Sequence, residues 1–90
     1  MEKRSVKVYV PVLASFDENG CLMPTEVIWE DGTKYEIDSV LDVRPAPALK
    51  VGGQGDRYTV LIHGQSSHLF FERSAGLSGN QMGRWFVERK

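Results

Sequence analysis

The chain contains 90 residues, of which 41% are hydrophobic and 26% are charged, and its formal net charge is −1. This length fits one domain, and this composition is typical of a globular rather than a disordered chain. The near-zero net charge offers no general affinity for polyanions, and a single cysteine excludes internal disulfides and cysteine-based zinc sites. We expect one small domain over residues 1–90.

The N-terminal residues, Met1-Glu2-Lys3-Arg4-Ser5, lead into an alternating pattern and not into a continuous apolar run. A signal peptide or a transmembrane helix would need such a run. We therefore expect no signal peptide and no membrane-spanning segment, and we predict a cytoplasmic location.

Charge is distributed unevenly along the chain. Residues 17–42 carry eight acidic side chains and one basic one, a net of −7, whereas residues 44–90 carry seven basic and three acidic ones, a net of +4. The molecule is dipolar if these two segments lie on different sides of the fold, and the charges cancel if their strands interleave. Both arrangements remain open at this point.

The first predicted element is a strand over residues 5–16, in which four valines spaced two apart share one face. Period-two alternation of β-branched residues is typical of a half-buried strand. Pro11 has no amide hydrogen to donate, so we expect an edge or a bulge at that position. Residues 17–20, Asp-Glu-Asn-Gly, follow as a hairpin turn in which Gly20 is free to take a positive φ.

The clearest hairpin spans residues 25–43 and turns at Asp31-Gly32. Its turn can contain two or three residues. The two possibilities shift the pairing of the strands by one residue, and such a shift exchanges the two faces of a strand. A two-residue turn mixes charged and apolar side chains on both faces, whereas a three-residue loop ending at Gly32 gives one apolar face. We predict the three-residue loop, which pairs Trp29 with Thr33 and Val27 with Tyr35.

The second half of the chain contains three further predicted strands, over residues 57–63, 68–73 and 84–88. Long loops over residues 44–56 and 74–83 precede the first and the last of them. A four-residue turn over residues 64–67 would join the first two strands and give one apolar face. This turn places Ile62 opposite Leu69 and Val60 opposite Phe71.

Six predicted strands, joined mostly as hairpins and without helical periodicity, indicate an all-β fold. We expect a small antiparallel meander of about six strands. It would close into an SH3-like or similar barrel, or form a two-layer sandwich. Closure is favoured because it hides strand edges that a thin core cannot otherwise protect.

Three parts of the sequence carry a resemblance to a known family. They are residues 24–44, the Gly52-Gly53-Gln54-Gly55 segment with the following Arg57-Tyr58, and the closing Arg84-Trp85-Phe86-Val87. Through these segments the chain resembles, over nearly its whole length, a family of short bacterial proteins to which no activity is assigned. The resemblance implies a bacterial origin and adds no site residue.

Two histidines and one cysteine are the candidate metal-binding or nucleophilic residues. The predicted hairpin places His63 opposite His68, but a zinc site needs three or four protein ligands and no third ligand is positioned. Cys21 has no neighbouring base in the sequence and suits a half-buried structural thiol. We therefore predict no catalytic residue, no metal and no cofactor, and we expect that the protein is not an enzyme.

Two loops match ligand-binding motifs only in part. The glycine-rich segment at residues 52–55 could cradle a phosphate, but a strand and not a helix follows it. The Asp17-x-Asn19-Gly20 turn matches only the tail of a calcium-binding loop. We interpret the first segment as a crossover loop and the acidic segment as a solvated face.

Apolar side chains on the second face of several strands are the basis of our leading functional hypothesis. If the valines of the first strand face the core, Tyr9 and Leu13 point outward, and the predicted pairings add Leu61 and Phe70. Either Trp85 or Phe86 must join them, and we include Phe86 in this face. A patch of this size on neighbouring strands is typical of an interface. We therefore expect a non-catalytic protein-interaction module that binds a protein partner or self-associates, for example as a homodimer. The alternative, that the 44–56 loop or another strand covers this face, stays open.

Nucleic-acid binding by the basic C-terminal half is the alternative function. Small barrels bind single strands by stacking bases on aromatic side chains within a basic groove. The small net charge and the lack of a dense basic cluster count against this function. Its candidate contact residues are Arg57, Tyr58, Arg73, Arg84 and Trp85.

Overall fold

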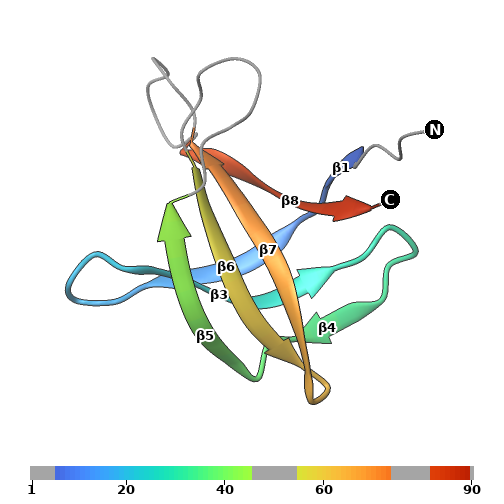
Figure 1. The fold of residues 1–90 in the computed structure, drawn as a ribbon, viewed down its shortest axis with the longest axis horizontal. Helices are drawn as coiled ribbons and strands as arrows, with labels where there is room; N and C mark the ends of the chain where they lie inside the picture. The colour runs from blue at the N-terminus through green and yellow to red at the C-terminus, as the bar shows by residue number, and fades with distance from the viewer. Residues whose placement is uncertain (1–5, 46–54, 74–81, 90) are drawn as a thin grey trace.

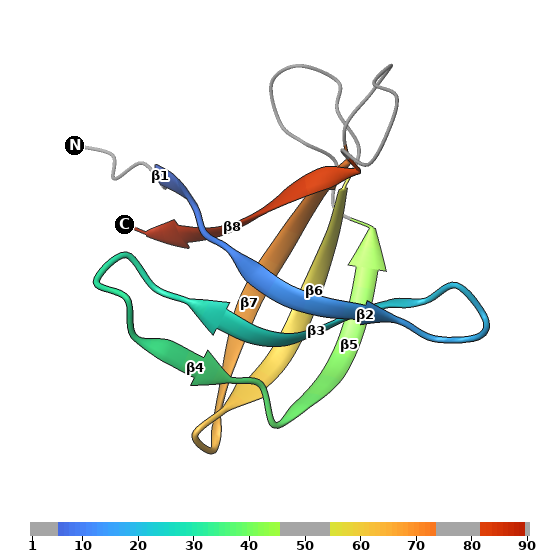
Figure 2. The same cartoon turned by 180° about the vertical axis from the view of Figure 1, so that it is seen from behind.

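The computed structural model describes residues 6–45, 55–73 and 82–89. These residues form two antiparallel sheets that face each other (Figures 1 and 2), so the all-β prediction is confirmed. No helix that could cross a membrane occurs in the described parts of the chain. The strands are β1 (Val6–Tyr9), β2 (Val12–Phe16), β3 (Leu22–Ile28), β4 (Lys34–Glu36), β5 (Ser39–Pro45), β6 (Gly55–Ile62), β7 (Gln65–Arg73) and β8 (Gly83–Arg89).

The larger sheet has the strand order β1-β8-β7-β6-β5, and the smaller sheet has the order β2-β3-β4. Among the described residues these ladders do not close into a barrel. Of the two predicted architectures the sandwich is therefore the observed one, and our preference for closure was wrong. Most of the two predicted long loops, residues 46–54 and 74–81, lies outside the described residues, as does any cover that the 44–56 loop provides.

The predicted strand over residues 5–16 is divided into β1 and β2 at Pro11. The Val10 amide donates to the Trp85 carbonyl in the larger sheet at 3.1 Å, whereas the Pro11 carbonyl accepts from the Ile28 amide in the smaller sheet at 3.0 Å. Pro11 itself has no N–H that would need a partner. The irregularity expected at this residue is thus a corner, where the chain leaves one sheet and enters the other.

The second strand of the 25–43 hairpin is divided in the same way, into β4 and β5. The Ile37 amide donates to the Thr25 carbonyl in the smaller sheet at 2.9 Å, and the next amide, that of Asp38, donates to the Leu61 carbonyl in the larger sheet at 2.7 Å. Two such corners turn six predicted strands into eight observed ones. At each corner the chain stops pairing in one sheet and starts pairing in the other, so each of these two predicted strands contributes to both layers.

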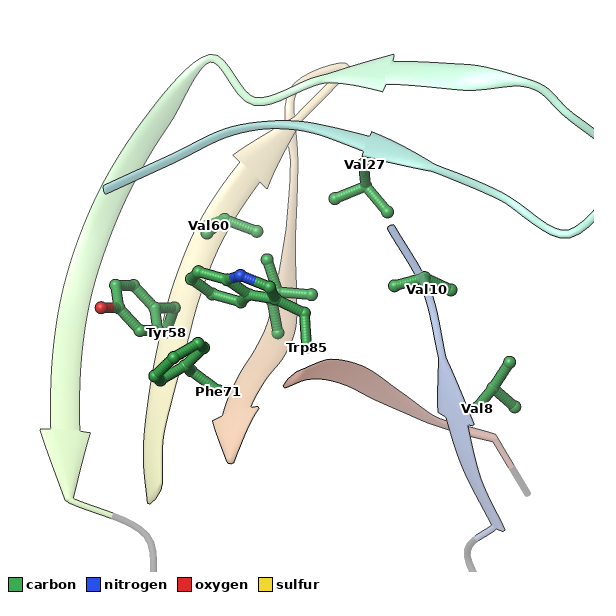
Figure 3. Packing of buried hydrophobic residues seen from close by; sticks show 8 residues of the cluster. Val8, Val10, Val27, Tyr58, Val60, Phe71 and Trp85 are labelled. Atoms are coloured by element: carbon green, nitrogen blue, oxygen red, sulfur yellow. The ribbon is translucent and has the colours of Figure 1, made fainter. Parts of the chain in front are cut away.

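The core lies between the two sheets and combines aromatic and β-branched side chains. Figure 3 shows Tyr58, Phe71 and Trp85 packed at one end, with the valines extending toward the other. Burial of one such side chain contributes about 1.5–3 kcal/mol. The core cluster consists of Val8, Val10, Val27, Tyr58, Val60, Leu69, Phe71 and Trp85.

The register predicted for the hairpin between β3 and β4 is confirmed. Val27 lies opposite Tyr35, the Trp29 amide donates to the Thr33 carbonyl at 2.7 Å, and Gly32 has a φ of 88°. A residue without Cβ takes this left-handed conformation at low cost. The turn chemistry at Gly32 therefore fixes the faces of both strands.

The turn predicted between β6 and β7 was wrong. His63 and Gly64 both have positive φ, 52° and 77°, and Ile62 lies opposite Gln65. This is the two-residue turn whose twist suits a hairpin. Compared with the four-residue loop, it moves every pairing by an even number of residues, so the inward and outward faces stay as predicted. Tyr58 instead of Ile62 lies opposite Leu69.

Charge is separated between the two layers. The segment that contains β2, β3 and β4, residues 12–38, carries seven acidic side chains and one basic one, a net of −6. The other described residues carry six basic and four acidic side chains, a net of +2. Of the two arrangements left open by the sequence, the dipolar one is observed, because the acidic segment builds one sheet nearly alone.

Candidate functional site

A single row of side chains crosses the outer face of the five-stranded sheet. Register places Arg44 opposite Arg57, Arg57 opposite Phe70, Phe70 opposite Phe86 and Phe86 opposite Tyr9. Directly opposite residues of neighbouring strands share a face. We call these five residues the outer row. It has an arginine half on β5 and β6 and an aromatic half on β7, β8 and β1.

The aromatic half of the outer row is closely packed. The rings of Phe70 and Phe86 are stacked with centroids 5.0 Å apart and planes 6° apart, and Tyr9 meets Phe86 edge-on at 5.7 Å. The Lys7 ammonium lies 4.7 Å from the Phe86 ring centroid. Phe86 is consequently only 7% exposed although it faces away from the core, whereas Tyr9 is 41% exposed.

One carboxylate holds the groups around this aromatic half together. Glu72 accepts hydrogen bonds from the Tyr9 hydroxyl at 2.9 Å, from Lys7 at 3.2 Å and from Arg84 at 3.3 Å. Arg84 also lies over the Tyr9 ring, 4.1 Å from its centroid. Partial burial alone would raise the pKa of Glu72, but these hydrogen bonds and the Lys7 charge outweigh it and lower the pKa.

Glu72→Gln is expected to lower the free energy of unfolding by about 1 kcal/mol at neutral pH, because a neutral amide accepts weaker bonds from the two cations. The lowered pKa of Glu72 means that the wild type holds this stability above the ordinary glutamate range and loses it as the pH falls through the folded-state pKa. Urea denaturation at neutral and acidic pH measures both effects. A wild-type-to-variant difference that stays constant into acid would contradict this role for the carboxylate charge.

The five residues predicted to form one interaction face do not all lie together. Tyr9, Phe70 and Phe86 form the aromatic half of the outer row. Leu61 lies on the same sheet face but opposite Ser66, four residues along β7 from Phe70. Leu13 is 53% exposed on β2, in the other sheet. The chain changes sheets at Pro11, so Tyr9 and Leu13, which share a face in the sequence pattern, are separated in space.

The residues predicted to contact nucleic acid are divided between the core and the surface. Tyr58 and Trp85 are 4% and 9% exposed, with ring centroids 5.2 Å apart, so neither ring is open to a base. Arg73 pairs with Asp56 at 2.7 Å. Arg57 lies in the outer row, and Arg84 lies beside it on the same outer face, opposite Glu72. The sequence left open whether Trp85 or Phe86 points outward, and the structure places Phe86 on the outer face and Trp85 in the core, which rules out Trp85 as a contact residue.

The histidine pair and the cysteine are not placed as predicted. His63 lies in the turn and His68 lies opposite Thr59, so the two rings do not face each other. Cys21 is exposed and not half-buried, because it precedes β3 at the edge of a second cleft of about 550 Å³. The Tyr58 hydroxyl reaches this cleft, where burial raises its pKa. Within the described ranges, no group of three His, Cys, Asp or Glu residues is suited to hold a metal.

A cleft of about 740 Å³ enters the sandwich between the two sheets. Trp29 and Tyr35 line it from the smaller sheet, and Ile62 and Leu69 line it from the larger one. His63 meets Tyr35 edge-on at 6.1 Å, so the β6–β7 turn borders the cleft. The rim of the cleft carries polar and charged side chains, namely Gln65, Ser67, His68, Glu88 and Arg89.

Two strands that line this cleft, β7 and β8, have a neighbour on only one side over part of their length. β7 pairs with β6 along its length but with β8 only through residues 70–73. Residues 87–89 of β8 pair with β1 alone. Figure 1 shows β7 and β8 diverging from their paired ends. Residues 65–69 of β7 therefore have an edge to which no other described strand is bonded, and we call it the free edge of β7.

Sequence reasoning missed this cleft as a site, although several of its residues were predicted to face the core. Trp29 and Tyr35 share the apolar face of the β3–β4 hairpin, as predicted, but both remain partly exposed. The feature of the sequence that could have indicated the cleft is the apolar face of this hairpin, which is larger than a three-stranded sheet can bury. The free edge itself had no signal, because it depends on where β8 stops pairing with β7.

Comparisons with known proteins add no relative: no protein-family model matches the chain, no curated protein matches it, and no solved structure matches it. The resemblance to a family of short bacterial proteins thus stays an expectation from the sequence. The candidate sites rest on geometry and chemistry alone.

Proposed function

We propose that this protein is a non-catalytic protein-interaction module, and that it binds an extended segment of a partner as a strand added to the free edge of β7. One observation carries the proposal, namely that the free edge borders an apolar cleft of about 740 Å³. Backbone groups on a strand edge supply affinity for an extended chain, and pockets for alternate side chains supply selectivity.

The composition of the free edge suits strand addition. Its residues, Gln65-Ser66-Ser67-His68-Leu69, include no proline, lysine or acidic residue, which are the usual means of blocking an edge. The opposite rim of the cleft, formed by β8, carries Glu88 and Arg89. Arg89 is engaged by Glu30 at 3.2 Å. The β7 side is therefore the more favourable one for a new strand.

The floor of the cleft defines the chemistry of the partner segment. Side chains of an added strand alternate between the two sheet faces. Those that point inward would meet Trp29, Tyr35 and Ile62, so they are expected to be apolar. Those that point outward would lie beside the polar outer side of β7. An extended segment with apolar residues at every second position fits this site.

For the location and the assembly state we keep the expectations from the sequence as part of the proposal. We place the protein in the bacterial cytoplasm, without catalytic residues or a cofactor. A second copy of this chain is another conceivable source of a strand, because two free edges of β7 could pair with each other. The apolar floor of the cleft favours a segment of another protein, since an edge-to-edge dimer of this chain would leave that floor uncovered.

Ser67 and Ser66 offer a matched pair of variants for the test. Ser67 lies opposite Val60 and lines the cleft, whereas Ser66 lies opposite Leu61 on the outer face. Ser67→Glu is expected to weaken binding of library-selected peptides at least about tenfold, because its carboxylate would lose water inside an apolar cleft. Ser66→Glu adds the same charge and should leave the affinity unchanged. Calorimetric titration measures both.

Hydrogen exchange locates the bound peptide independently. Those amides of residues 65–69 that point away from β6 should exchange more slowly in the complex, because a new ladder protects them. Sedimentation of the free protein shows whether it self-associates. Peptides whose affinity is insensitive to Ser67→Glu but lost with Tyr9→Glu would move the interface to the outer row. A concentration-dependent dimer abolished by Ser67→Glu would replace the peptide with a second copy.

A further inference from the structure

The arginine half of the outer row carries two positive charges, and among the described residues only that of Arg44 is paired with a carboxylate. Like charges directly opposite each other on neighbouring strands are unfavourable, yet Arg44 and Arg57 are such a pair. Arg44 is bonded to Asp42 at 2.7 Å. The Nε of Arg57 is buried and has no hydrogen-bond partner among the described residues. A desolvated guanidinium nitrogen without an acceptor is costly. This buried Nε is out of reach of a ligand, so an external oxyanion would bond the terminal nitrogens of the same guanidinium and compensate its charge.

The surroundings of this pair favour an anionic ligand. The layer that carries the outer row has a net charge of +2 in its described residues, against −6 for the other layer. The carboxylates on this face are largely engaged: Asp42 bonds Arg44, and Glu72 bonds Lys7 and Arg84. Glu88 lies opposite Lys7. The Arg57 guanidinium is thus the cation on this face with an unmet hydrogen-bonding group.

We propose that the outer row binds single-stranded nucleic acid, with Arg44 and Arg57 holding a phosphate and with Phe70 and Tyr9 contacting bases. The planar guanidinium donates pairs of hydrogen bonds that match phosphate oxygens. Aromatic side chains on an open sheet face take bases without sequence preference. Most of this site lies on the sheet face away from the cleft, and Phe70 is the one residue of the outer row that also lines the cleft. The two arginines are not part of the proposed peptide site, so this proposal does not depend on it.

The order of side chains in the row favours nucleic acid over an acidic peptide. The row spans four strand spacings, about 19 Å in all, and changes from guanidinium groups to aromatic rings along its length. A nucleic-acid strand presents phosphates and flat bases side by side, which matches this change. An acidic peptide would satisfy the arginines but would leave the aromatic half without a partner.

Fluorescence anisotropy with a labelled oligothymidylate at low salt tests the proposal. Arg57→Gln and Arg44→Gln are each expected to weaken binding roughly tenfold. The double variant should lower the slope of log affinity against log salt by about 0.7, because the two arginines hold one phosphate of a single strand. Asp42→Asn removes a competing carboxylate and is expected to strengthen binding. The Arg44 and Asp42 side chains are 68% and 44% exposed, so the variants at these two positions should stay folded, and thermal denaturation checks the fold of Arg57→Gln.

Arg89→Gln is the matched control, because it removes the same charge from the inner side of β8. It should leave oligonucleotide affinity unchanged apart from a small uniform effect. The proposal is overturned if the wild type does not bind the oligonucleotide, or if Arg89→Gln weakens binding as much as Arg57→Gln. It is also overturned if a polyglutamate peptide competes as well as the oligonucleotide, since the ligand would then be an acidic protein. Loss of oligonucleotide binding with retained peptide binding in the cleft separates this site from the proposed function.

Discussion

Replacing Trp85 with alanine is expected to destabilise the protein by about 3–5 kcal/mol, the usual cost of truncating a buried aromatic residue to alanine. Its ring packs against Tyr58 at 5.2 Å and Phe71 at 4.9 Å, in the aromatic end of the core that Figure 3 shows. Small domains are stable by about 5–15 kcal/mol in total, so this loss would remove much of that stability. Urea denaturation followed by far-UV circular dichroism measures it.

The control for Trp85 is Arg89→Ala on the same strand, which removes only an exposed ion pair with Glu30. That change should cost less than about 1 kcal/mol. The comparison separates the two roles that Trp85 was given. A Trp85→Ala protein of normal stability that fails to bind an oligonucleotide would contradict the core assignment. It would restore the role that the sequence pattern suggested.

Turn chemistry explains which hairpin could be predicted. Around Gly32 only one loop length gives both strands an apolar face, and the glycine is available for the positive φ that this loop requires. Around His63 the same reasoning failed, because a positive φ at a non-glycine residue is uncommon and the polar residues 64–67 looked like a longer loop. The observed two-residue turn leaves residues 65–69 in β7. The free edge proposed as the binding site was therefore hidden from sequence reasoning.

Alternation along a strand predicted local faces but not the sheet to which they belong. Val8 and Val10 are buried and Tyr9 and Leu13 are exposed, as the pattern indicated. However, the period-two pattern continues without interruption through the corner at Pro11, so nothing in it shows that Tyr9 and Leu13 lie in different layers. The predicted single interaction face was lost for this reason, although three of its members remain neighbours.

Pairing between the ends of the chain was the least predictable feature, and the outer row depends on it. Tyr9 meets Phe86 only because β1 pairs with β8, residues far apart in sequence. The cover of Phe86 by Lys7 and Phe70 is likewise a tertiary effect. Single-sequence patterns report how residues near each other in the chain share a face. They carry no information on which strands from opposite ends become neighbours.

Gly83→Ala is the second change with a large expected effect. Gly83 begins β8, one residue before the predicted start of that strand, and lies opposite Arg73. A Cβ at this position would collide with the Glu72 carbonyl oxygen and would come within 2.6 Å of the Phe71 ring. The ring packs on Trp85, so it cannot move without disturbing the core. We expect a loss of up to about 3 kcal/mol, as for other overpacked sites.

Two further variants separate this steric cost from backbone strain. Gly20 has a φ of 81° and no atom within 4 Å of an added Cβ, so Gly20→Ala should cost only the left-handed strain of about 1–2 kcal/mol. Phe71→Leu removes the ring that the methyl group introduced by Gly83→Ala would strike. The double variant Gly83→Ala with Phe71→Leu should therefore be more stable than the sum of the single effects predicts, by about 0.5 kcal/mol or more. Strict additivity in thermal denaturation would show that Phe71 does not fill the space beside Gly83. The collision with the Glu72 carbonyl oxygen would then account for the cost of Gly83→Ala without a contribution from the Phe71 ring.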